Sequence, residues 1–147
     1  MGTDQTVEIL NELLALERGS LAPRLLESTA FADNASAADL ANVQRIAQAS
    51  QEHSAWLANM VLSLGGVPGL RLGDLRTADM HYLDIRSSWP RFVADREALI
   101  RKYQLANERI DDEPRASDLI QRILQRHRQE LALLSGEPSH ERDAVTG

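Results

Sequence analysis

The chain contains no cysteine, and aromatic residues make up only 4% of its 147 residues. The absence of cysteine excludes disulfides and thiolate metal ligands. No stretch reaches the ~18 uninterrupted apolar residues that a transmembrane helix needs. The first ten residues have neither the basic region nor the long apolar region of a signal peptide. We therefore expect a cytoplasmic protein that makes no membrane contact.

A basic surface is also missing from the sequence. The formal net charge is -6 at pH 7, and no long run of Lys and Arg occurs. Nucleic-acid binding depends on basic side chains that neutralise phosphates, so DNA and RNA are not expected partners. Hydrophobic residues make up 43% of the chain, which suits one domain large enough to bury its own core.

Apolar residues recur with the helical period of 3.6, and the alternation typical of strands is hard to find. The sequence predicts an all-α fold of four helices, at about 4–31, 36–65, 89–110 and 114–136. Ser36 and Asp39 form a start that resembles a capping box. Gly65, Pro114 and Gly136 are residues that typically end or begin helices. Pro23 should kink the first helix.

The lengths of the connections suggest how these helices are arranged. Short connections at 32–36 and 111–116 predict two antiparallel helix hairpins, and a longer segment from 65 to about 80 joins them. This is the arrangement of ferritin-like bundles, although an up-and-down bundle with one extended loop stays open as an alternative. The predicted bundle covers 1–136. The tail at 137–147 lacks an apolar stripe and is expected to be flexible.

Two polar residues interrupt the apolar stripes of the first two helices. Glu17 shares a helix face with Leu10, Leu13, Leu14, Leu21 and Leu25, and a buried carboxylate is costly unless it is neutralised. His53 lies in a similar stripe on the second helix, with Val43, Ile46, Ser50, Leu57, Met60 and Leu64. Two helices thus direct side chains of the metal-ligand type inward.

The other two helices supply three more candidates. His127 and Glu130 have the i, i+3 spacing that places both on one helix face. Glu97 lies near the apolar positions Val93 and Ile100. The predicted metal ligands are therefore Glu17, His53, Glu97, His127 and Glu130. Carboxylates with imidazoles suit iron, manganese or zinc.

The first 136 residues resemble the bacterioferritin branch of the ferritin-like superfamily, which includes bacterioferritin-like and rubrerythrin-like proteins. The resemblance is carried by the segment 10–17, by the distances from Glu17 to His53 and from His53 to the helix end at 65–68, and by the segment 118–124. It implies that Glu17 and His53 are metal ligands. It also implies that His127 and Glu130 occupy, in reversed order, the positions of a glutamate and histidine motif.

That family oxidises ferrous iron with oxygen or peroxide at a di-iron centre, and the chain departs from its pattern. Ser50 stands where the family has a bridging glutamate, so one ion is favoured over two. Gln51 stands where the family has a haem-ligating methionine, so no haem is expected. The tail lacks a fifth short helix, so the resemblance implies a homodimer rather than a 24-subunit storage cage.

A second interpretation needs no metal. His53 and His127 could be core histidines held by hydrogen bonds, and Glu17 could be neutralised by Arg24 or Arg96 within a buried ion network. The chain would then be a metal-free ferritin-like bundle that acts as a structural or partner-binding module. The sequence therefore leaves open whether the protein is an enzyme.

Overall fold

A computed structural model describes residues 3–20, 22, 36–69 and 85–134. Its four helices are α1 (Thr3–Arg18), α4 (Ala37–Ser63), α6 (Ile85–Arg109) and α7 (Pro114–Leu134). No strand occurs in these parts of the chain, so the predicted all-α fold of four helices is confirmed for them. The predicted kink at Pro23 and the tail at 137–147 lie outside the described residues.

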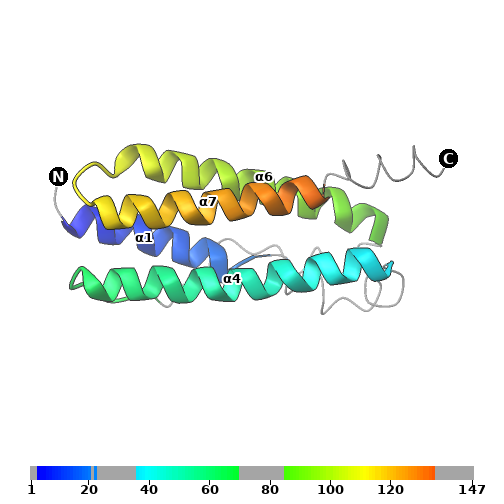
Figure 1. The fold of residues 1–147 in the computed structure, drawn as a ribbon, viewed down its shortest axis with the longest axis horizontal. Coiled ribbons are helices and arrows are strands. Elements are labelled where there is room, and N and C mark those ends of the chain that lie inside the picture. Colours follow the sequence, from blue (N-terminus) through cyan, green and yellow to red (C-terminus); the bar gives the residue numbers. More distant parts are fainter. Residues whose placement is uncertain (1–2, 21, 23–35, 70–84, 135–147) are drawn as a thin grey trace.

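The helices form two packed pairs that lie side by side (Figure 1). The most extensive contacts join α1 to α4 and α6 to α7, and α4 also packs against α7. The two helices of each pair run in opposite directions, whereas α4 and α6 run in the same direction. Helix α6 therefore begins at the end of the bundle opposite to the end of α4.

The sequence signals at the two ends of α4 have a structural counterpart. Ser36 caps the start of the helix, where its Oγ accepts a hydrogen bond of 3.0 Å from the backbone N–H of Asp39. At the other end Gly65 has a φ of 84°, which glycine adopts without the steric penalty of a Cβ. The N–H of Gly66 then donates to the carbonyl of Val61 at 2.9 Å, as in a Schellman motif.

The residues that follow α4 are hydrogen-bonded to α1. The side chain of Asn11 donates to the carbonyl of Val67 and accepts from the N–H of Gly69, at 3.1 Å and 2.8 Å. A Cβ on Gly66 would lie 2.6 Å from a side-chain carbon of Val7, so glycine permits the close approach of this segment to α1. These contacts help to hold α1 and α4 together.

Helix α6 begins about one turn before the predicted start near residue 89, so that Pro90 lies inside the helix. Its C-terminal end at Arg109 and the start of α7 at Pro114 agree with the predicted short connection. None of the helices in the described ranges combines the length and apolar character needed to cross a bilayer.

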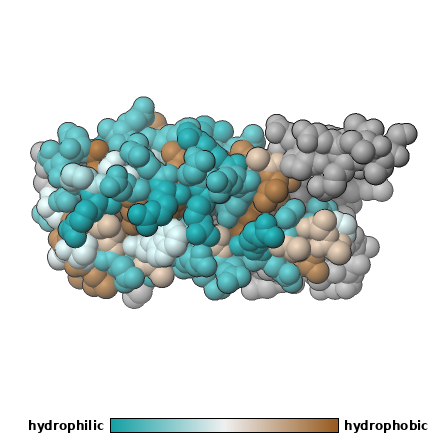
Figure 2. All heavy atoms as spheres, in the orientation of Figure 1, coloured by the Kyte–Doolittle hydropathy of each residue, from teal (hydrophilic) through white to brown (hydrophobic). Residues whose placement is uncertain are grey.

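The core runs between the four helices. Its fully buried members come from every helix and include Leu10, Leu14, Leu57, Tyr103 and Ile120. The face shown in Figure 2 is mostly hydrophilic, with hydrophobic side chains in scattered patches. This distribution is expected for amphipathic helices that turn one stripe toward a common interior.

Candidate metal centre

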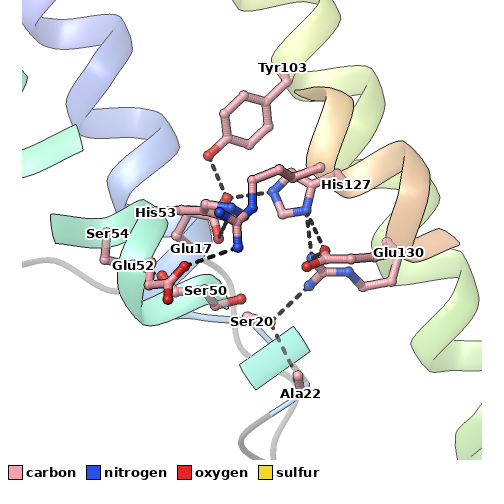
Figure 3. Close-up of polar contacts among 12 residues, drawn as sticks. Glu17, Ser20, Ala22, Ser50, Glu52, His53, Ser54, Tyr103, His127 and Glu130 are labelled. Atoms are coloured by element: carbon pink, nitrogen blue, oxygen red, sulfur yellow. Dashed lines mark hydrogen bonds and ion pairs between the residues drawn. The ribbon is translucent and has the colours of Figure 1, made fainter. Parts of the chain in front are cut away.

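Four polar side chains from four different helices meet inside the bundle (Figure 3). They are Glu17 of α1, His53 of α4, Tyr103 of α6 and His127 of α7. Both histidines and the tyrosine are 0% exposed, and Glu17 is 2% exposed. Each lies in the apolar stripe of its helix, so the packing that forms the core also brings these side chains together.

Glu17 is the centre of this group. Its Oε2 accepts a hydrogen bond of 2.5 Å from the Tyr103 hydroxyl and lies 2.7 Å from Nε2 of His127. Its Oε1 lies 3.5 Å from Nδ1 of His53 but makes no hydrogen bond. One oxygen of the Glu17 carboxylate is therefore hydrogen-bonded, and the other faces His53 without a hydrogen bond.

Several buried polar atoms near Glu17 also lack a hydrogen-bond partner. They are both ring nitrogens of His53 and the hydroxyl oxygen of Ser50, which lies one turn earlier on α4. An unpaired buried polar group costs about 1–3 kcal/mol. Such groups in a native protein therefore suggest a binding partner for them, such as water or an ion.

Glu17, His53 and His127 each offer one ligand atom, and these three atoms lie within 4.8 Å of one another. We call these three residues the Glu/His/His cluster. Donor atoms around a tetrahedral zinc ion stand roughly 3.3 Å apart, given metal–ligand distances of about 2.0–2.2 Å. The cluster could thus hold a metal ion after small side-chain movements. Two imidazoles and one carboxylate are a ligand set for zinc and for non-haem iron.

The second ring nitrogen of His127 faces away from Glu17, toward Arg96 and Glu130. Nδ1 of His127 lies 2.7 Å from Nη2 of Arg96 and 3.1 Å from Oε1 of Glu130. The same Nη2 donates to Oε1 of Glu130 at 3.2 Å, and Nη1 donates to the hydroxyl of Ser20 at 3.0 Å. His127 therefore joins the Glu/His/His cluster to a buried ion pair.

The burial of these groups shifts their pKa values. Burial alone raises the pKa of Glu17, but the contacts with His127 and His53 outweigh it and hold the pKa far below its usual range. Burial lowers the pKa of His127, but the hydrogen bonds to Glu130 and Glu17 outweigh that effect and the net shift is upward. Burial and the neighbouring Glu17 carboxylate raise the pKa of Tyr103. Glu17 is therefore ionised and Tyr103 is neutral near pH 7.

These shifts predict how the stability of the metal-free protein depends on pH. The contribution of Glu17 is fully present above its unfolded pKa of 4.5 and is lost as the pH falls through the lower folded value. The contribution of His127 is fully present below its unfolded pKa of 6.5 and is lost as the pH rises through the higher folded value. We expect the free energy of unfolding, measured with denaturant and a chelator, to be highest between pH 4.5 and 6.5. A maximum at alkaline pH would contradict this electrostatic description.

The structure brings together three of the five predicted ligands. Glu17, His53 and His127 form the cluster, whereas Glu130 is buried on the far side of His127 and pairs with Arg96. Glu97 is exposed on α6 and lies outside the cluster, so its assignment as a ligand is not supported. Its neighbour Arg96 occupies the interior position instead. Arg24, the other proposed partner of Glu17, lies outside the described residues.

Sequence reasoning gave Tyr103 no part in the site and treated Arg96 only as a possible charge partner of Glu17. A signal for both was present, since the buried residues of α6 follow a regular spacing and include Phe92, Arg96, Leu99, Tyr103, Ala106. The predicted stripe used Ile100, which is buried, but combined it with Val93, which is only half-buried, and this selected Glu97 instead of Arg96. A charged side chain is almost never fully buried unless it is paired, so the position of Arg96 within an apolar stripe indicates a buried partner, as the position of Glu17 does on α1.

Comparison of the chain with protein-family models, with curated proteins and with solved structures found no match in any of the three. The class of the protein is therefore defined by the fold and the site alone. Over its described residues it is an all-α protein of four helices whose interior holds a buried Glu/His/His cluster able to bind a metal ion.

Proposed function

We propose that the protein binds one divalent metal ion through Glu17, His53 and His127. The observation that carries this proposal is the set of unpaired polar atoms beside Glu17. Oε1 of Glu17 and both nitrogens of His53 are buried and have no hydrogen-bond partner. A cation among these atoms would accept lone pairs from the carboxylate and the imidazoles, and would remove the cost of leaving them unpaired.

One ion fits the charges of the site better than two. Two closely spaced cations need bridging anions, and the only carboxylate in the cluster is Glu17. A second buried carboxylate, Glu130, is paired with Arg96. Ser50 is buried on the same face of α4 as His53 but offers a neutral hydroxyl.

Iron is our first candidate for the ion, with manganese and zinc as alternatives. The ligand set is one that non-haem iron uses, and the resemblance to bacterioferritins points to the same metal. The parallel directions of α4 and α6 support a ferritin-like topology (Figure 1). Iron at this site would supply one-electron chemistry with oxygen or peroxide. The chain itself would keep Glu17 ionised, through His127 and His53, in a site from which bulk water is excluded.

A specific observation favours a second candidate function, that of a metal-free bundle with a structural or partner-binding role. Arg96, His127, Glu130 and Ser20 already form a connected network of hydrogen bonds. Such a network can specify the arrangement of a core without any metal. It leaves both ring nitrogens of His53 without a hydrogen bond, however, and for that reason we place metal binding first. A homodimer, which the resemblance implies, is compatible with both functions.

The experiment that separates the two functions is a metal-binding measurement on the wild-type chain. Protein purified without chelator is analysed for metal content and then titrated anaerobically with ferrous iron, manganese and zinc. We expect one ion per chain and a metal-dependent rise in melting temperature. At a hundredfold excess over Kd the stabilisation is about 2.7 kcal/mol, which corresponds to roughly 5–10 °C for a chain of this size. A folded protein that binds none of the three ions would exclude the metal function.

A further inference from the structure

Arg96 is the largest side chain that is fully buried in the described part of the molecule. A guanidinium remains charged at any physiological pH, and removing it from water is costly unless its donors are paired. Here Nη1 donates to Ser20, and Nη2 lies between Nδ1 of His127 and Oε1 of Glu130. The position of the guanidinium is thus determined by contacts with two residues of α7 and with Ser20, which follows the end of α1.

The contact of Arg96 with His127 determines what that histidine can do. A guanidinium only donates hydrogen bonds, so Nδ1 of His127 accepts when it is bonded to Arg96 at 2.7 Å, whereas it must carry a proton to donate to Glu130 at 3.1 Å. When Arg96 occupies Nδ1, the ring proton of a neutral His127 lies on Nε2 and is directed at Oε2 of Glu17. Nε2 then has no lone pair for a metal ion, so Arg96 and a metal ion compete for His127.

The same contact places a permanent positive charge against a residue of the cluster. A charge that is buried and bonded to a ligand is poorly screened, and it opposes the entry of a second cation. The Glu130 carboxylate lies 3.2 Å from Nη2 of Arg96 and 3.1 Å from Nδ1 of His127, so it offsets part of this charge, but the guanidinium is closer to the ring nitrogen, at 2.7 Å. The cluster thus has a resident cation beside it before any metal binds.

We propose that Arg96 controls metal binding in this cluster, because its guanidinium occupies one side of His127 as a resident cation and weakens the affinity for divalent ions. The inference rests on the proposed function, since it concerns the same cluster. It assigns to Arg96 a part in setting the affinity of the cluster for metal. The expected result is a site that exchanges its ion readily.

The test compares zinc and manganese binding to the wild-type chain and to three variants by titration calorimetry. Arg96→Gln removes the charge but keeps an amide that can donate to Glu130, and we expect it to bind at least tenfold more tightly. Arg96→Lys keeps the charge and should retain the wild-type affinity. Arg126→Gln is the matched control, because Arg126 is a partly exposed arginine of α7 that pairs with Glu52. It should also leave the affinity unchanged.

Circular dichroism checks that each variant is folded, and Arg96→Met replaces Arg96→Gln if the latter is unfolded. A wild-type chain that binds an ion and an Arg96→Gln variant that binds it no more tightly would overturn the inference and leave the proposed function in place. Binding by Arg96→Gln but not by the wild type would support the inference and overturn the proposed function. Binding by neither folded protein would overturn both.

Discussion

Replacing Glu17 with glutamine is expected to abolish divalent metal binding, with a loss of affinity of at least a hundredfold. Glutamine has nearly the same shape and can still accept the hydrogen bond from Tyr103, but its amide carries no charge to attract a cation. Changes to groups that only orient a metal ligand typically cost about 10–100-fold in affinity, and Glu17 is a ligand itself and the only carboxylate of the cluster. The measurement is a titration with zinc, manganese and ferrous iron, together with the melting temperature in the presence and absence of each ion.

Glu12→Gln is the matched control for this variant. Glu12 lies on the same helix, its side chain is 46% exposed, and it makes only a surface ion pair with Arg109. The substitution changes the net charge by the same amount, yet we expect it to retain the wild-type affinity and the metal-dependent rise in melting temperature. If Glu17→Gln behaved like Glu12→Gln, the carboxylate of Glu17 would not be a metal ligand.

Replacing His53 with leucine is expected to have opposite effects on stability and on binding. Both nitrogens of His53 are buried without a hydrogen-bond partner, and leaving such groups unpaired costs about 1–3 kcal/mol. A leucine fills a similar volume without polar atoms. It also removes the 3.5 Å contact that helps to lower the pKa of Glu17, so the free energy of unfolding of the metal-free protein should rise by about 1 kcal/mol rather than by the full cost of two unpaired groups. The same variant should lose metal binding, because one of the three ligands is gone. Denaturant unfolding with a chelator and metal titration measure the two effects.

The control for His53→Leu is Gln51→Leu, which places the same apolar side chain at an exposed position of α4. A surface substitution of this kind usually changes stability by about 0.5 kcal/mol or less. A metal-free His53→Leu protein that is less stable than the wild type would indicate that His53 is satisfied as a structural core residue. The combination of greater stability and lost binding would indicate that His53 serves to bind a metal ion rather than to stabilise the fold.

The helices could be predicted from the sequence because their determinants are local. The apolar stripes, the cap at Ser36, the glycines after α4 and the proline at the start of α7 each act within a few residues. Glu17 and His53 could be selected for a similar reason, since a polar side chain in an apolar stripe is visible from spacing alone. The start of α6 was placed one turn too late, and boundaries of this kind depend on contacts beyond the helix.

The interior residues of α6 could not be assigned correctly from the local sequence pattern. Adjacent residues on a helix point about 100° apart, so an error of one residue in the inward face exchanges Arg96 for Glu97. As a result, the sequence analysis placed the anion Glu97 in the site, where the structure has the cation Arg96. The hydroxyl of Tyr103 escaped notice because nothing near it in the chain reveals its acceptor, Glu17, which lies 86 positions away.

The sequence by itself therefore determined the four helices and the presence of the ligand-type side chains Glu17, His53 and His127 on the inward faces of three of them. Only the tertiary structure decided which of these side chains meet, since Glu17 and His127 are 110 positions apart and come together through the packing of different helices. It also decided that Arg96, rather than a fourth ligand, lies against the cluster. The physical reason is that helix formation depends on neighbours in the chain, whereas the chemistry of a buried site depends on charges and distances between segments that only folding brings together.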